Sequence, residues 1–129
     1  MKHILSENEV RSLFSINRPP LKKAVIKTNE SIYLVDFDDI VRCEADGNYT
    51  HFFLKTGQKI TVAKTLKEYE KLLNESRLFF RLHNSHIINL NYMDRFDKKD
   101  GGTVVMKDKS IVPVSTRKKN ELLMLLETI

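Results

Sequence analysis

The sequence predicts a mainly β domain with one internal and one terminal helix. Three observations support this fold class. Residues 24–63 alternate short apolar segments with turn signals, residues 65–74 place apolar side chains at helical spacing, and residues 116–126 repeat that spacing. Neither internal repeats nor low-complexity tracts interrupt these segments, and 129 residues are about one domain's worth of chain.

The first 20 residues differ in character from the rest. Ser6 is a suitable N-cap with Glu9 three residues later, and apolar residues at helical spacing follow. The segment 17–20 (NRPP) then ends the helix, because proline lacks an amide donor and disfavours helix just upstream. We expect residues 1–20 to be a linker or helical tail and residues 21–129 to be the compact domain.

Short strands joined by tight turns are expected next. Asp46-Gly47-Asn48 is the clearest turn, since all three residue types tolerate the backbone angles that it requires. The predicted strands of this part are residues 24–28, 31–36, 39–45, 49–54 and 59–63.

One helix and further strands complete the predicted domain. Thr65 and Glu68 form a capping box at the start of the helix over about 65–74. Strand-like segments follow at 79–83 and 92–98, and a hairpin is expected around 107–109. The final helix, about 116–126, is expected to turn four apolar side chains inward: Leu122, Leu125, Leu126 and Ile129.

Composition limits the classes of partner and compartment. The formal charge is +5 and the pI is near 9.3, a modest excess that favours a polyanionic partner without naming one. No apolar run approaches the roughly 20 residues of a membrane helix, and the first residues do not resemble a signal peptide. The single cysteine, Cys43, excludes an internal disulfide and fits a reducing cytosol. We therefore expect a cytoplasmic protein that does not enter the membrane.

The terminal helix begins with an unusual set of charges. An N-cap at Ser115 or Thr116 is followed by Arg117, Lys118 and Lys119. Each cation costs roughly 0.3–1 kcal/mol against the helix dipole. A helix start with free amide groups binds phosphate readily, so an anion would complete this site. A solvated basic face explains the same residues equally well. A weaker basic strip surrounds the first helix: Lys55, Lys59, Lys64 and Lys67.

The segment FFRLHNSHIINL (79–90) interrupts a buried run with hydrogen-bonding side chains, and several chemistries fit it. Its two histidines, with His51 or Cys43, could bind a metal, but they flank a turn and no CxxC or carboxylate spacing supports the site. Ser85 with a histidine could act as a hydrolase, but no G-x-S-x-G elbow surrounds it. The polar side chains could also simply satisfy the backbone of their own loop.

Nucleic acid is the remaining class of partner for this segment. Asn84 can pair with the N6 and N7 edge of adenine, while His83 and Ser85 can contact phosphate or base acceptors. The residues at and after the Asp46-Gly47-Asn48 turn have the same polar character, and loops held by a rigid sheet often carry binding residues. From the residue patterns alone, the prediction stops at a basic β domain suited to nucleic acid.

Several motifs, in order, resemble the LytTR DNA-binding domain, the output module of bacterial LytR/AlgR-family two-component response regulators. They are DIVRCEADGNYT (39–50), KTLKEYEKLL (64–73), FFRLHNSHIINLNYM (79–93), DGG (100–102) and VPVSTRKK (112–119). The resemblance covers about residues 22–127. It implies a mainly β fold in which small antiparallel sheets form an elongated arrangement with short helices.

The resemblance also implies a mode of DNA binding. The expected ligand is duplex DNA at paired direct repeats in promoters, bound through loops by a dimer. Asn84 and Arg117 match the base-contacting positions, and a third contact falls on Thr50 or His51. The expected DNA-binding residues are Asn48, Thr50, His51, Lys64, His83, Asn84, Ser85, Arg117, Lys118 and Lys119.

Further partners follow from the same resemblance. A full-length response regulator carries a receiver domain and answers to a sensor histidine kinase. A receiver domain needs about 120 residues, which 20 leader residues cannot form. The chain is then either an effector domain cut from a longer protein, which we favour, or a naturally single-domain member. No enzymatic activity, cofactor or metal is expected. The alternative is a non-catalytic protein-interaction or dimerisation module with a basic surface.

Overall fold

The computed structural model describes residues 4–15 and 23–129, and its strands are all short. They are β1 (Lys23–Lys27), β2 (Ile32–Asp36), β3 (Ile40–Asp46), β4 (Tyr49–Leu54), β5 (Lys59–Val62), β6 (Phe79–His83), β7 (His86–Asn89), β8 (Met93–Asp97), β9 (Thr103–Met106) and β10 (Ile111–Pro113). The helices are α1 (Glu7–Ser15), α2 (Leu66–Asn74) and α3 (Thr116–Thr128), with short 3-10 turns at Phe37–Asp39, Leu90–Tyr92 and Lys99–Gly101.

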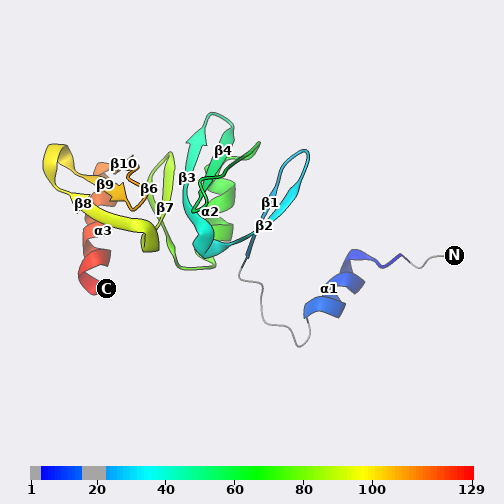
Figure 1. Cartoon of the computed structure of the whole chain (residues 1–129). Coiled ribbons are helices and arrows are strands. Elements are labelled where there is room, and N and C mark those ends of the chain that lie inside the picture. Colours follow the sequence, from blue (N-terminus) through cyan, green and yellow to red (C-terminus); the bar gives the residue numbers. More distant parts are fainter. Residues whose placement is uncertain (1–3, 16–22) are drawn as a thin grey trace.

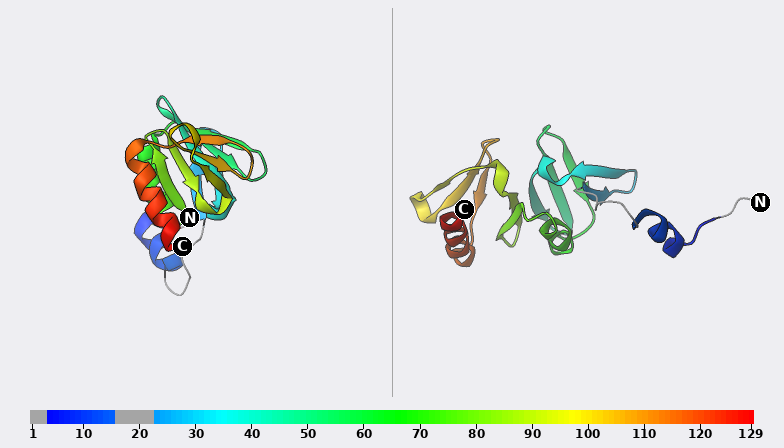
Figure 2. Two further views of the ribbon diagram at one scale, coloured as in Figure 1. Left: turned by 90° about the vertical axis from the view of Figure 1, so that its left-hand side faces the viewer. Right: turned by 90° about the horizontal axis from the view of Figure 1, so that it is seen from below.

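The strands form three antiparallel sheets that follow one another along an elongated molecule (Figures 1 and 2). The β1–β2 hairpin comes first, a five-stranded sheet in the order β5-β4-β3-β7-β6 lies in the middle, and a three-stranded sheet in the order β10-β9-β8 follows. The helix α2 covers one face of the central sheet, and α3 packs beside β6 and the last sheet. This confirms the predicted mainly β class and the elongated arrangement of small sheets.

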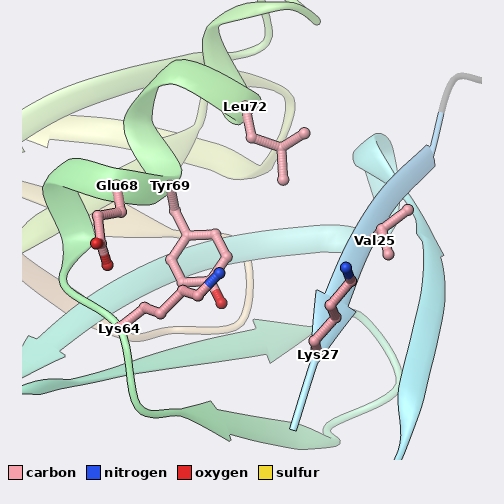
Figure 3. Close-up of a pocket in the computed structure, with 6 residues that line it drawn as sticks. All are labelled: Val25, Lys27, Lys64, Glu68, Tyr69 and Leu72. Carbon is pink, nitrogen blue, oxygen red and sulfur yellow. The ribbon is translucent and has the colours of Figure 1, made fainter. Parts of the chain in front are cut away.

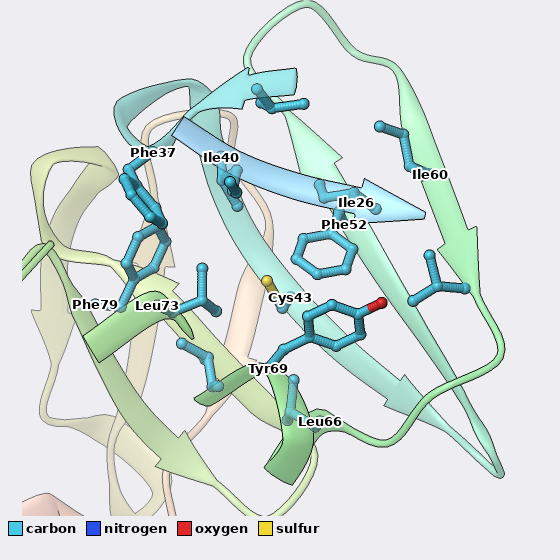
Figure 4. Packing of buried hydrophobic residues seen from close by; sticks show 14 residues of the cluster. Ile26, Phe37, Ile40, Cys43, Phe52, Ile60, Leu66, Tyr69, Leu73 and Phe79 are labelled. Carbon is cyan, nitrogen blue, oxygen red and sulfur yellow. The ribbon is translucent and has the colours of Figure 1, made fainter. Parts of the chain in front are cut away.

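One hydrophobic core lies between α2, the β1–β2 hairpin and one face of the central sheet (Figure 4). Phe52 of β4 meets Tyr69 of α2 edge to face, with ring centroids 4.8 Å apart. Ile26 of the hairpin and Leu73 of α2 are fully buried against them. Burial of one such side chain stabilises the fold by roughly 1.5–3 kcal/mol, so this core fixes the position of α2 on the sheet.

A second core lies on the other face of β3, β6 and β7, against the last sheet and α3. Leu82 of β6 and Leu122 of α3 are fully buried in it. The expectation that Leu126 and Ile129 also face inward is wrong, because they are 36% and 83% exposed. The second core meets α3 around Leu122, and the last turns of the helix extend beyond it.

The helix starts agree with the predicted caps. The Thr65 amide donates to the Glu68 carboxylate at 3.1 Å, which completes the capping box of α2. Ser115 is the N-cap of α3, because its hydroxyl oxygen accepts from the Lys118 amide at 3.3 Å. Helix α3 runs two residues beyond the predicted end.

The predicted tail contains α1, whose start has the expected reciprocal bonds between Ser6 and Glu9. The predicted boundary between residues 20 and 21 lies outside the described residues, so the division into tail and domain stays a prediction. Over residues 4–15 and 23–129, none of the helices has the length and apolar character needed to span a membrane.

Candidate nucleic-acid interface

The two polar turns singled out in the sequence lie side by side at one end of the central sheet. Strand β3 pairs with β7 so that Glu44 lies opposite His86, and the Ala45 amide donates to the Ser85 carbonyl at 2.8 Å. The start of α3 joins the same end, because the Ser115 amide donates to the Leu82 carbonyl at 3.0 Å. Segments far apart in the sequence therefore converge on one edge of the molecule (Figure 1).

A groove of about 300 Å³ runs between the β6–β7 turn and the starts of α2 and α3. Its lining residues are Lys67, Glu70, Arg81, His83, Asn84, Ser115, Arg117 and Lys118. Four of these eight residues are lysine or arginine and one is acidic. A concave surface with excess positive charge attracts polyanions, and phosphate contacts dominate the affinity of proteins for DNA.

The β6–β7 turn presents polar groups with defined orientations. Asn84 is exposed at its tip. The Ser85 amide donates to Nδ1 of His83 at 3.1 Å, so the neutral His83 ring carries its proton on Nε2. His83 thus offers a hydrogen-bond donor to the groove, which suits a phosphate oxygen. Ser85 takes part through its backbone and does not line the groove.

The side chain of Arg81, on β6, bonds to the backbone of this turn. Its Nε donates to the His83 carbonyl at 3.2 Å, and its Nη2 donates to the Asn84 carbonyl at 2.7 Å. Its Nη1 forms an ion pair with the carboxylate of Glu70 on α2. A single guanidinium therefore links the turn to a helix on the other side of the groove.

The three cations at the start of α3 are not equivalent. Arg117 is exposed in the groove, and its side chain has no bonded partner within residues 4–15 and 23–129. The Lys118 ammonium lies 3.1 Å from the Glu121 carboxylate and 5.9 Å from the centre of the Phe80 ring. Lys119 is partly exposed and lies outside the groove lining. Of the two α3 cations that line the groove, Arg117 is thus the one whose side chain has no bonded partner within the described residues.

Thr50 and His51, the two alternatives for a third contact, point to opposite faces of the sheet. Thr50 is fully buried, and its hydroxyl donates to the Lys64 carbonyl at 2.7 Å. His51 lies on the outer face, with Nε2 3.0 Å from the Asp46 carboxylate and Nδ1 2.7 Å from the Thr61 hydroxyl. Strand alternation turns Thr50 inward, where its side chain is bonded within the fold, and turns His51 outward.

His51 lies on the same face of the central sheet as His83. The strand registers pair His83 with His86, His86 with Glu44, and Glu44 with His51, so these residues form one row across the sheet. His51 is three strands from His83, or about 14 Å at about 4.8 Å per strand. Asn48 is exposed in the turn next to this row. The β3–β4 end can therefore reach a long ligand that occupies the groove.

Lys64, one of the expected DNA-binding residues, does not line the cationic groove. It lines a second groove, of about 410 Å³, on the hairpin side of α2 (Figure 3). The lining residues are Val25, Lys27, Lys64, Glu68, Tyr69 and Leu72. Lys67 enters the cationic groove instead, and neither it nor Arg81 was assigned from the sequence. The basic strip around α2 was the available signal for Lys67, but the direction of each lysine depends on how α2 packs.

The geometry does not favour the metal alternative. Cys43 is fully buried in the first core, on the opposite face from His83 and His86, and burial raises the pKa of its thiol. Burial also lowers the pKa of His86 below its usual value, partly opposed by Glu44. Within the described ranges, no three His, Cys, Asp or Glu residues are grouped to hold a metal ion.

Comparison with known proteins identifies the family. The family model of the LytTr DNA-binding domain matches residues 30–127. The chain is 35% identical over 107 residues to the sensory transduction protein LytT of Bacillus subtilis, covering 81% of this chain and 43% of LytT. It is 32% identical over 112 residues to the heme-containing CO-sensing transcriptional regulator RcoM 2 of Paraburkholderia xenovorans, covering 84% of this chain and 41% of that protein.

A solved structure has the same fold. It is the LytTr DNA-binding domain of a methyl-accepting/DNA response regulator from Bacillus cereus, with a TM-score of 0.70 and 25% identity, covering 83% of this chain and 98% of that one. The chain spans about two fifths of the length of the curated relatives that it matches. With its matching residues, its sheets and its cationic groove, this chain belongs to the family of LytTR DNA-binding domains.

Proposed function

We propose that the chain is the effector domain of a transcription regulator and binds duplex DNA sequence-specifically through loops. The observation that carries the proposal is the groove, which an exposed Asn84 and Arg117, unpaired within the described residues, line from two different elements. Both side chains form bidentate hydrogen bonds with bases, Arg with guanine and Asn with adenine. These two residues would read base edges in the major groove.

The remaining groove residues would position the phosphate backbone. His83 offers its Nε2 donor, and Lys67 and Lys118 supply charge. His51 would make the third contact from the β3–β4 end, about 14 Å away across the sheet, with Asn48 beside it. Lys119 would add a phosphate contact at the groove's border. Phosphate contacts of this kind fix orientation and make affinity dependent on salt.

The biological setting is part of the same proposal. The chain would act in the cytoplasm on paired direct repeats in promoters, as a dimer on the DNA, and without enzymatic activity. In a full-length protein, a receiver domain and a sensor histidine kinase would control it. One relative is a sensory transduction protein and another is a heme-containing CO-sensing transcriptional regulator, and only the second name states a signal.

Fluorescence anisotropy at several salt concentrations tests this function, with a duplex selected from random sequences. Arg117→Ala should weaken binding to the selected duplex by roughly 1–3 kcal/mol and relax the preference at one base pair. Lys119→Ala should weaken all duplexes alike and reduce the salt slope by about 0.9. If Arg117→Ala binds the selected duplex as tightly as wild type, Arg117 does not make the proposed base contact.

The alternative, a protein-interaction or dimerisation module, has one observation in its favour. The outer face of the β1–β2 hairpin exposes Val25, Ile32 and Leu34, which are 39%, 69% and 60% accessible. A protein with only that function would not bind duplex DNA with an affinity that falls as the salt concentration rises. The same titration therefore separates the two proposals.

A further inference from the structure

The cations of the groove differ in what they touch, and Arg81 differs most. Arg117 has no bonded partner in the described part of the chain, whereas all three donor-bearing nitrogens of Arg81 are engaged. Two of them bind carbonyl groups of the β6–β7 turn, and the third binds Glu70. A guanidinium already bonded in this way has few donors left for phosphate.

We propose that Arg81 is a positioning residue: it holds the backbone of the turn so that Asn84 presents its amide to DNA, and Glu70 fixes Arg81 in that pose. This inference rests on the proposed function and adds a determinant of specificity to it. The guanidinium of Arg81 then bonds to groups of the protein and not to DNA, although the residue lines the groove.

The strand register explains why the turn needs such a support. The pairing of β6 with β7 shifts between Arg81 and His83, so the end of β6 departs from the regular ladder. Backbone groups at an irregularity of this kind lose ladder partners and need others. The His83 and Asn84 carbonyls obtain theirs from the Arg81 side chain, at 3.2 and 2.7 Å.

The consequence for Asn84 is an outward side chain on an anchored backbone. Its carbonyl is bonded toward the protein, while the residue as a whole is exposed. A bidentate amide–adenine contact needs both the N–H and the C=O group of the side-chain amide aligned with the base edge. A mobile backbone at Asn84 would therefore reduce the preference for one base pair more than it reduces the affinity for DNA of any sequence. Lysine cannot replace Arg81 here, because its single ammonium cannot reproduce the planar fork.

Glu70 has a second effect on the groove. It is the acidic residue in a lining that otherwise suits phosphate. Its ion pair with Arg81 offsets its charge and anchors the guanidinium from α2. Removal of this carboxylate should therefore raise general attraction to DNA while it lowers selectivity, two changes of opposite sign from one substitution.

The test compares Arg81→Lys with wild type on the selected duplex and on a duplex changed at the base pair that Asn84→Ala identifies. We expect the ratio of the two dissociation constants to fall by roughly 5-fold to 100-fold, the range of one bidentate base contact, with an unchanged salt slope. In 15N relaxation without DNA, residue 84 should become more mobile in the variant. Glu70→Gln should lower the ratio in the same direction while binding of random duplexes tightens.

Several outcomes overturn the proposal. If Arg81 is a phosphate contact, Arg81→Lys keeps the ratio and Arg81→Ala reduces the salt slope by about 0.9. A ratio that stays at the wild-type value in Arg81→Lys rejects the positioning role alone. A wild-type protein that binds no duplex rejects the proposed function and this inference together. Thermal melts of each variant show whether the comparison is made between equally folded proteins.

Discussion

The β6–β7 turn and the β3–β4 turn lie at the same end of one sheet, yet their polar side chains have different freedom. At the β6–β7 turn the backbone carbonyls are bonded to Arg81, which leaves the side chain of Asn84 exposed. At the β3–β4 end, Thr50 is turned inward and both ring nitrogens of His51 are already engaged.

Charge increases this difference. The groove beside the β6–β7 turn has four cations and one acid, and that acid is paired. The β3–β4 end places carboxylates next to His51, from Asp46 at 3.0 Å and from Glu44 in the neighbouring strand position. We infer that the groove provides most of the affinity and specificity, and that the β3–β4 end adds a smaller contact.

The largest expected effect comes from the core beneath the groove. Leu82→Ala and Leu73→Ala each remove a fully buried leucine, one from each core, and each should cost about 2–5 kcal/mol of unfolding free energy. Only the Leu82 side chain shares its core with α3, through Leu122, so its removal should loosen the start of α3 against β6. Urea denaturation measures the first effect, and anisotropy on the folded fraction should show weaker DNA binding for Leu82→Ala alone. Equal DNA affinities would contradict this coupling.

Thr50→Val tests the β3–β4 end with a side chain of similar shape. The change removes the part-buried 2.7 Å hydrogen bond to the Lys64 carbonyl, and such a bond contributes about 0.5–1.5 kcal/mol. We expect a lower free energy of unfolding by denaturant titration and unchanged DNA affinity at a temperature where the variant is folded. A loss of affinity without a loss of stability would identify Thr50 as a contact after all.

Two lysines at the start of α2 form a matched pair. Lys67 lines the cationic groove and Lys64 lines the hairpin-side groove (Figure 3). Lys67→Ala should weaken binding to all duplexes and reduce the salt slope by about 0.9, while Lys64→Ala should change neither quantity. Anisotropy titrations over a range of salt concentrations compare the two. The reverse result would indicate that DNA binds on the hairpin side of α2.

The smallest effect is a pH dependence of stability from His86. Burial lowers its native pKa below the value of about 6.5 expected in the unfolded chain. Below that pH the unfolded state binds more protons, so stability should be fully present above about pH 6.5 and fall as the pH drops further. Thermal unfolding from pH 8 to 5 measures the trend, and His86→Gln should flatten it. If the stability of the variant falls more steeply with decreasing pH than that of wild type, groups other than His86 cause the pH dependence.

Local chemistry made several features predictable from the sequence. The capping boxes, the Asp46-Gly47-Asn48 turn and the bounds of β4 follow from side chains a few residues apart, and the structure confirms them. The motifs between 39 and 119 were also sufficient to indicate the LytTR family, which the family comparison confirms. The assigned DNA contacts themselves stay predictions.

The sequence by itself therefore determined the fold class, the family and two segments rich in binding chemistry, because these depend on local pattern. Only the tertiary structure decided that Thr50 turns inward while His51 turns outward, and that Lys64 and Lys67 line different grooves. It also decided that the guanidinium of Arg81 bonds to the protein while that of Arg117 has no partner among the residues that the structure describes. Each of these choices depends on which face of a strand or helix packs against the core, and partners distant in sequence set that face.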